Sequence, residues 1–212
     1  MALAKICGLS TPETVAAALE HGAAYVGLNF FEKSPRYVTP ELAARLAAPA
    51  RGRARIVAVM VDPSDALLRE VSQALHPDFI QLHGRETPPR VREAAMRSGA
   101  GTIKVISIGE EADLGRIGDF EAVADHIMLD AKVPPGSDRP GGQGVSFDWS
   151  LTAGRKFARP WFLAGGLDPW NVAEAARVSG APIVDVSSGV ERGAGLKDAA
   201  LIEAFLRAAR SA

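Results

Sequence analysis

Eight short runs rich in Val, Ile and Leu recur at fairly regular spacing along the chain. Most are continuously apolar rather than alternating, which is typical of strands buried on both faces in a parallel sheet. The runs cover residues 3–7, 25–30, 55–61, 79–82, 102–106, 126–129, 161–164 and 183–186. This pattern predicts eight parallel strands.

Segments with helical spacing and helix start or stop signals lie between most of these runs. Ser10 to Glu13 offers a capping box with an early proline, which predicts a helix through residues 15–19 that Gly22 closes. Asp168 and Pro169 open a second helix in the same way, with Gly180 near its end. Residues 64–75, 88–97 and 198–210 have similar spacing, whereas the slots around 119–124 and 147–157 have the weakest pattern.

Regular alternation of strands and helices predicts βαβ units around a parallel sheet. Eight strands with eight helix slots fit a closed (β/α)8 TIM barrel, an α/β fold, in one domain that spans residues 1–212. A length of 212 residues is near the lower end for this fold, so its helices and loops must be short. A doubly wound open sheet is the alternative architecture.

Charge and cysteine content narrow the classes of partner. The chain has 24 basic and 25 acidic residues, which gives neither the basic excess of a nucleic-acid binder nor an acidic tail. Its single cysteine excludes an internal disulfide, and no apolar stretch approaches the roughly 20 residues needed to cross a bilayer. The opening residues turn polar too early for a secretory signal. We expect a cytoplasmic protein with a small-molecule partner and no nucleic-acid or membrane partner.

The polar residues that end the apolar runs are the first candidates for a site, because a barrel of this type carries its chemistry at the carboxyl ends of its strands. These ends are expected to share one mouth. In chain order they are Cys7, Asn29, Asp62, His83, Ser107, Asp130, Gly165-Gly166 and Ser187-Ser188-Gly189.

Glycine-rich segments follow the last two runs, where many barrels hold a phosphate with backbone N–H groups. One Gly-Gly pair after a strand is more often a tight turn, but Gly165-Gly166 and Ser187-Ser188-Gly189 on adjacent strands together favour a phosphate site. A third such loop, Gly141-Gly142-Gln143-Gly144, is interpreted as a flexible lid or as a source of further amides for the same ligand.

Cys7 and Asp130 are candidates for proton transfer. A free cysteine is often simply a buried small hydrophobe, so position alone does not distinguish a functional role for Cys7 from core packing. A thiol can act as a base where its neighbours favour the thiolate. An aspartate directly after an apolar run is costly to place without a partner or a task. Together the two predict a general acid and a general base on well-separated strands.

Three further residues are candidate substrate contacts. Arg36 lies in a long, proline-marked loop, for which a solvated surface role is the default, but its planar fork suits a carboxylate. His83 is as readily a structural hydrogen-bonding group as a ligand contact. Asp185 lies inside the eighth run, where it binds a sugar hydroxyl or holds neighbouring loops together.

The sequence as a whole resembles the phosphoribosylanthranilate isomerase family. The resemblance rests on several segments together, with mild departures at Asn29-Phe30 and Gln143. The segments are residues 5–8, 33–38, 81–84, 129–130, 141–144, 147–149, 164–167, 171–172 and 185–191.

The resemblance implies an isomerase of tryptophan biosynthesis that needs no metal or cofactor. Its substrate is a phosphorylated aminosugar, N-(5-phosphoribosyl)anthranilate, and its assembly is a monomer or a homodimer. Asp130 then protonates the ring oxygen and Cys7 removes the proton from sugar C2. Arg36 holds the anthranilate carboxylate, and the main chain around Gly166, Ser188 and Gly189 holds the phosphate.

Three other readings stay open on the sequence. The histidine-pathway isomerase resembles a two-aspartate design with a bisphosphorylated ligand, so Cys7 argues against it, although a side activity on that aminoaldose stays open. Later tryptophan-pathway barrels share the glycine-rich seventh and eighth strands but not the pairing of Cys7 with Asp130. A non-catalytic phosphosugar-binding barrel is the third.

Overall fold

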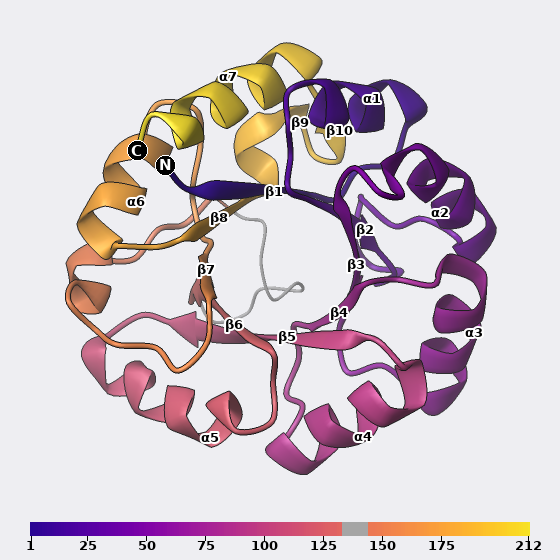
Figure 1. Ribbon diagram of the computed structural model, residues 1–212, viewed down its shortest axis with the longest axis horizontal. Helices are drawn as coiled ribbons and strands as arrows, with labels where there is room; N and C mark the ends of the chain where they lie inside the picture. The colour runs from indigo at the N-terminus through magenta and orange to yellow at the C-terminus, as the bar shows by residue number, and fades with distance from the viewer. Residues whose placement is uncertain (133–143) are drawn as a thin grey trace.

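Eight parallel strands form a closed barrel in the computed structural model, which describes residues 1–132 and 144–212 (Figure 1). The last strand pairs with the first, with Lys5 opposite Asp185, so an open sheet is excluded and the predicted barrel is confirmed. The strands are β1 (Leu3–Cys7), β2 (Tyr25–Asn29), β3 (Arg55–Met60), β4 (Phe79–Leu82), β5 (Gly101–Ile108), β6 (His126–Ala131), β7 (Trp161–Leu163) and β8 (Ile183–Val186).

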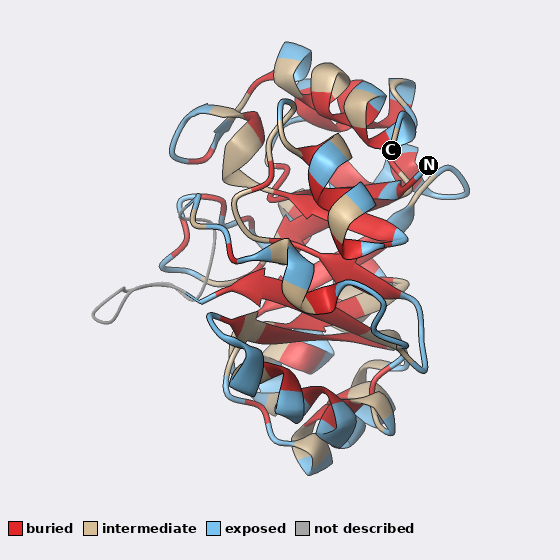
Figure 2. Cartoon of the chain, turned by 90° about the vertical axis from the view of Figure 1, so that its left-hand side faces the viewer, coloured by how far each residue is buried: buried red, intermediate tan, exposed pale blue. Residues whose placement is uncertain are grey.

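The α-helices form an outer ring around the strands (Figure 1). Their order around the ring follows the chain, as expected when each strand is followed by a crossover helix. They are α1 (Pro12–Glu20), α2 (Pro40–Ala47), α3 (Asp65–Leu75), α4 (Pro88–Ser98), α5 (Ile117–Glu121), α6 (Val172–Ser179) and α7 (Ala199–Arg210). The N- and C-terminal residues lie side by side in both views (Figures 1 and 2).

Local capping explains where several helices begin. Ser64 and Asp198 accept hydrogen bonds from backbone N–H groups in the first turns of α3 and α7, at the predicted starts. For α1 the cap is Thr11, which accepts from the Thr14 N–H, so the predicted box of Ser10 with Glu13 is wrong by one residue.

The helix expected from Asp168-Pro169 begins later than predicted. Asp168 Oδ1 accepts hydrogen bonds from the N–H groups of Trp170 and Asn171, so these residues form a turn and α6 starts at Val172. Its end at Gly180 is as expected, with a left-handed φ of 71°.

The two weakest helix slots are also the least helical. Residues 119–124 overlap only the end of α5, which follows a 3-10 helix, η2 (Glu111–Arg116). Two glycines nearby, Gly115 and Gly118, lower helix propensity there. Residues 147–157 contain only a 3-10 helix, η3 (Trp149–Thr152), capped by Asp148. This slot of the ring therefore holds a short turn packed on α6 rather than a full helix.

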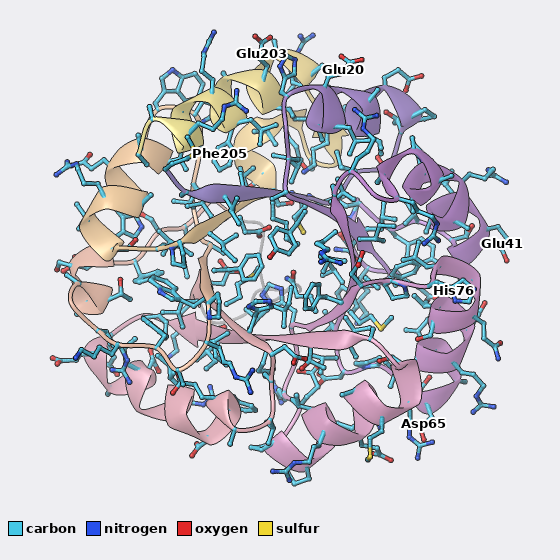
Figure 3. The ribbon with its side chains drawn as sticks, in the orientation of Figure 1. Glu20, Glu41, Asp65, His76, Glu203 and Phe205 are labelled. Carbon is cyan, nitrogen blue, oxygen red and sulfur yellow. The ribbon has the colours of Figure 1, made fainter. Side chains whose placement is uncertain are left out.

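The barrel strands and the outer helices differ in how far they are buried. The barrel strands are buried along most of their length, and each outer helix buries one face against them (Figure 2). Helix α7 shows this plainly in Figure 3, where Phe205 points toward the barrel and Glu203 points away from it. Phe205 is fully buried, whereas nearly half of the Glu203 side chain is exposed.

The barrel interior has its own small apolar cluster, distinct from the larger one between strands and helices. Cys7, Tyr25, Met128 and Phe162 belong to this inner cluster, and the partly buried Phe79 packs against it. After β8 the chain makes a 3-10 turn, η4 (Ser188–Val190), and a two-stranded hairpin of β9 (Glu191–Gly193) and β10 (Leu196–Lys197). Among the described residues, no helix is both long and apolar enough to cross a membrane.

Candidate active site

One cavity opens at the carboxyl ends of the strands, where a barrel of this type carries its chemistry. Nine of the ten predicted site residues line it, and Gly189 lines the adjoining cavity beside them. The nine are Cys7, Arg36, His83, Asp130, Gly165, Gly166, Asp185, Ser187 and Ser188.

Cys7 ends β1 with its side chain toward the barrel interior, where it is almost fully buried. Burial raises the pKa of the Cys7 thiol, while the ammonium groups of Lys5 and Lys197 oppose that shift and the Asp185 carboxylate adds to it. The sulfur therefore lies near two cations that favour its thiolate form. Neither lysine was predicted as part of the site.

Asp130 faces the same cavity from β6, and its carboxylate is oriented by its own strand. Oδ1 accepts a hydrogen bond of 2.9 Å from the Ala131 N–H. His83 Nε2 lies 3.2 Å from Oδ2, but the ring is not aligned for a hydrogen bond to it. Cys7 and Asp130 thus approach one space from strands that are three places apart around the barrel.

Arg36 is held by a carboxylate that the sequence analysis did not connect with it. Its Nε and Nη2 donate to the two oxygens of Glu191, at 2.7 and 2.9 Å, so the bidentate fork expected for a substrate carboxylate is occupied by the protein itself. Lys197 Nζ donates to the same carboxylate at 2.6 Å. The side chains of Arg36 and Lys197 therefore both bind the Glu191 carboxylate beside the cavity.

Burial and charge compete within this cluster. Burial alone would raise the pKa of Glu191, but hydrogen bonds and charges from Arg36 and Lys197 outweigh it and hold that pKa below its ordinary value. For Lys197, burial dominates over the attraction of Glu191 and lowers the pKa of the ammonium. Lys197 also donates to the Ser187 carbonyl at 2.9 Å, which ties the cluster to the end of β8.

Two glycines allow the loops to close around Arg36. A Cβ at Gly8 would lie 2.5 Å from Arg36 Cδ, and a Cβ at Gly195 would lie 2.5 Å from the Pro35 carbonyl oxygen. Both have left-handed φ values, 77° and 80°, that favour glycine. The loop after β2 therefore packs directly on the end of β1 and on the hairpin after β8.

The predicted phosphate end is built from closely packed main chain. A Cβ at Gly165 would lie 2.6 Å from the Ala131 N atom, and one at Gly189 would lie 2.0 Å from the Leu167 carbonyl oxygen. Packing alone thus requires glycine at these positions, whatever ligand binds. Of the third glycine-rich loop only Gly144 is described, and it lines the cavity; Gly141, Gly142 and Gln143 lie outside the described residues.

A buried ion pair supports the loop that follows His83. Lys104 in β5 donates to Glu86 at 2.6 Å and to the Gly84 carbonyl at 2.9 Å. Glu86 in turn accepts hydrogen bonds from the N–H groups of Gly84 and Asp62. Burial outweighs the attraction of Glu86 and lowers the pKa of Lys104.

Two of the predicted strand-end residues differ in role from the rest. Asp62 has a left-handed φ of 44° and accepts a hydrogen bond from the Arg85 N–H, so it holds a loop rather than lining the cavity. Ser107 does not end a strand, because β5 continues to Ile108, and it is not among the residues around the cavity. Asp185 does line it, but its carboxylate pairs with Lys5 at 2.7 Å.

Comparison with known proteins decides the family. A model of the N-(5'-phosphoribosyl)anthranilate (PRA) isomerase family matches residues 4–208. The isomerase of that name from Caulobacter vibrioides is 60% identical over 210 residues, which covers 99% of this chain and 96% of the relative. The chain belongs to this isomerase family. The family members so named are enzymes, and one from Mesorhizobium japonicum is 50% identical over 98% of this chain and 95% of its own length.

Solved structures of the isomerase family agree over the full chain. Phosphoribosylanthranilate isomerase from Thermotoga maritima is 34% identical and superposes with a TM-score of 0.89, with complete coverage of both chains. A structure of a phosphoribosylanthranilate isomerase in complex with reduced 1-(o-carboxyphenylamino)-1-deoxyribulose 5-phosphate is 33% identical and has a TM-score of 0.86, also over both full chains. A third is described as a monomer generated from the dimeric Thermotoga maritima isomerase.

Proposed function

We propose that this protein converts N-(5'-phosphoribosyl)anthranilate into 1-(2-carboxyphenylamino)-1-deoxyribulose 5-phosphate in tryptophan biosynthesis. The observation that carries the proposal is the placement of Cys7 and Asp130 on one cavity, from β1 and β6. An Amadori rearrangement needs a proton delivered to one side of a small sugar and a proton removed from another atom of it. The family relationship supports the same substrate.

In the proposed mechanism Asp130 begins as the general acid. Its carboxyl proton goes to the furanose ring oxygen, the bond between that oxygen and sugar C1 breaks, and the nitrogen lone pair forms the C1=N bond of a Schiff base. Cys7, as thiolate, then removes the proton from C2, and the electron pair of that C–H bond forms the double bond of an enolamine. The enolamine loses its hydroxyl proton and gains one at C1, which completes the ketone.

Two sets of residues that line these adjoining cavities suit the two anionic groups of this substrate. The cluster of Arg36, Glu191 and Lys197 has an excess of positive charge at one edge, where we place the anthranilate carboxylate. The closely packed backbone of Gly166, Ser188 and Gly189 borders the adjoining cavity, where we place the phosphate. His83 and Asp185 also line the cavity and are candidate contacts with the sugar.

A turnover assay on freshly generated phosphoribosylanthranilate tests the proposal. Loss of substrate fluorescence under metal-free conditions is expected for the wild type, and Cys7→Ser should lower kcat by orders of magnitude with little change in KM. Arg36→Ala should mainly raise KM. Absence of wild-type turnover would refute the proposed substrate, and the histidine-pathway aminoaldose would then be assayed.

We further propose that residues 1–212 form one domain and that the protein is a monomer or a homodimer. The barrel closes between β1 and β8, and α7 packs on β1, so both ends of the chain belong to the same core. Sedimentation analysis distinguishes the two assemblies.

A further inference from the structure

Lys5 is a buried charged side chain that the proposed mechanism does not use. It lies in the middle of β1, points into the barrel two residues before Cys7, and has no solvent exposure. Transferring an ammonium group into a protein interior is unfavourable unless neighbouring groups compensate for its lost hydration. A lysine at this position therefore needs an explanation beyond packing.

One partner of Lys5 is Asp185 on the neighbouring strand β8. Lys5 and Asp185 lie opposite each other in the strand register, and Nζ is 2.7 Å from Oδ1. Burial disfavours the Lys5 ammonium, but the Asp185 carboxylate and Cys7 outweigh burial and raise the Lys5 pKa. Lys5 is therefore held in its charged form inside the barrel.

The other neighbour of the Lys5 ammonium is the Cys7 sulfur. A Cβ built on Gly27 of β2 would lie 3.2 Å from Cys7 Sγ and also 3.2 Å from Lys5 Nζ. Both atoms thus flank a single point, and they are separated by no more than twice that distance. Because glycine has no side chain, residue 27 leaves the space that lets the ammonium reach up toward the sulfur.

Of the charged groups that act on the Cys7 thiol, Lys5 has the largest effect. Lys197 from β10 acts in the same direction on the thiol, but burial lowers the pKa of its ammonium. Asp185 acts in the opposite direction and more weakly than Lys5. Arg36, His83 and Asp130 line the cavity around Cys7, on its solvent side.

We propose that Lys5 is a positioning residue of this enzyme, whose ammonium, held by Asp185, stabilises the Cys7 thiolate from inside the barrel while that thiolate acts as the base. This inference rests on the proposed function, because it assigns Lys5 a task only if Cys7 takes up the proton from C2. It predicts that the ionisation of Cys7 depends on Lys5 even when no substrate is bound.

The chain makes this prediction measurable, because Cys7 is its only cysteine. Thiolate absorbance and the rate of alkylation by iodoacetamide therefore report on this one group. Removing Lys5 alone would leave Asp185 buried without its partner, so the test variant is the double substitution Lys5→Met with Asp185→Asn. The matched control is Lys104→Met with Glu86→Gln, which removes a second buried lysine–carboxylate pair that lies behind the strands.

In the double variant the thiol should titrate at higher pH than in the wild type. A unit charge about 6 Å away, at an effective dielectric constant of about 20, changes a protonation equilibrium roughly a hundredfold. The double variant also loses the weaker, opposing effect of the Asp185 carboxylate, so the net shift of the thiol equilibrium should be smaller than this. The thiolate fraction at neutral pH falls as the thiol pKa rises, and the greater nucleophilicity of the remaining thiolate offsets only part of that fall. Alkylation at neutral pH should therefore slow, by less than about tenfold. The control variant should keep the wild-type titration.

If the folded double variant keeps the wild-type pKa of the Cys7 thiol, the inference is overturned. An equal shift of the thiol pKa in the control variant would also overturn it. If the double variant does not fold, the variant Lys5→Gln takes its place, because glutamine retains a hydrogen-bond donor beside Asp185. The titration and alkylation of Cys7 are then measured in that variant. The pH profile of kcat/KM should move with the thiol titration. A wild type without turnover would refute the proposed function, whereas an unshifted thiol in an active enzyme would refute only the role of Lys5.

Discussion

Replacing Glu191 by glutamine removes the one carboxylate that holds both Arg36 and Lys197. Glu191 accepts from Arg36 at 2.7 and 2.9 Å and from Lys197 at 2.6 Å, and its side chain is almost fully buried. Glutamine keeps the shape and one acceptor oxygen but turns an N–H₂ group toward two buried cations. The variant should therefore lose stability and misplace the guanidinium of Arg36.

The expected loss follows from the burial of the pair. Breaking a buried ion pair by removing one partner costs about 3–5 kcal/mol, and the near-isosteric glutamine places Glu191→Gln near the lower end, at about 3 kcal/mol. For a chain of this length each kcal/mol corresponds to roughly 2–4 °C in Tm, so Tm should fall by about 6–12 °C. KM should rise about tenfold, because the positive edge of the cavity is displaced.

This stability difference should depend on pH with a definite sign. Against burial, Arg36 and Lys197 hold the pKa of Glu191 below its ordinary value, so the unfolded chain binds this proton more tightly than the folded protein. The stabilisation is then fully present above the unfolded pKa of about 4.3 and is lost as pH falls through the folded value. The gap in Tm between wild type and Glu191→Gln should be full at pH 7 and should narrow below about pH 4.

Thermal denaturation and steady-state kinetics on the same samples test this reasoning. The control is Glu203→Gln on the outer face of α7, where a half-exposed carboxylate lies 3.8 Å from His21 and a change within about 0.5 kcal/mol is expected. An unchanged Tm and KM in Glu191→Gln would refute the idea that this carboxylate organises Arg36. So would a loss of stability that does not vary with pH.

Three further outcomes are expected. Asp130→Asn should lower kcat by two orders of magnitude or more in the fluorescence assay with KM little changed, and a full-rate variant would remove the acid role. Gly189→Ala places a Cβ 2.0 Å from the Leu167 carbonyl oxygen, so the loop must shift and KM should rise about tenfold; an unchanged KM would contradict the phosphate assignment. Lys104→Met leaves Glu86 uncompensated and should lower stability by about 3–5 kcal/mol in thermal denaturation, with partial recovery on adding Glu86→Gln; equal stability of the single and double variants would count against this pair.

The barrel could be predicted because its signals are local. Each predicted apolar run contains most of a strand, and Ser64 and Asp198 cap their helices where the pattern placed them. Once a barrel was predicted, the carboxyl ends of its strands could be assigned to one mouth, and Cys7 and Asp130 do line one cavity there. The predicted helix boundaries were wrong where a side chain binds backbone N–H groups in place of the helix. One such case is the turn in which Asp168 accepts hydrogen bonds from Trp170 and Asn171 before α6.

The charged partners could not be predicted in this way. Lys5 and Lys104 lie inside apolar runs. Because a charged side chain is seldom fully buried without a partner, these two lysines could have indicated buried ion pairs. Which partner each lysine takes depends on contacts far along the chain. Lys5 and Asp185 are 180 residues apart, and Arg36 and Glu191 are 155 residues apart.

The sequence by itself determined the alternation of strands and helices, the number of barrel strands, and the polar residue types at most of the strand ends. These depend on hydrophobic periodicity and on capping, which act over a few residues. Only the tertiary structure decided that Glu191 occupies the fork of Arg36, that Asp185 pairs with Lys5, and that Lys197 lies near Cys7. Those contacts exist because β8 closes on β1 in one register and because the hairpin that follows β8 folds back over the loop after β2.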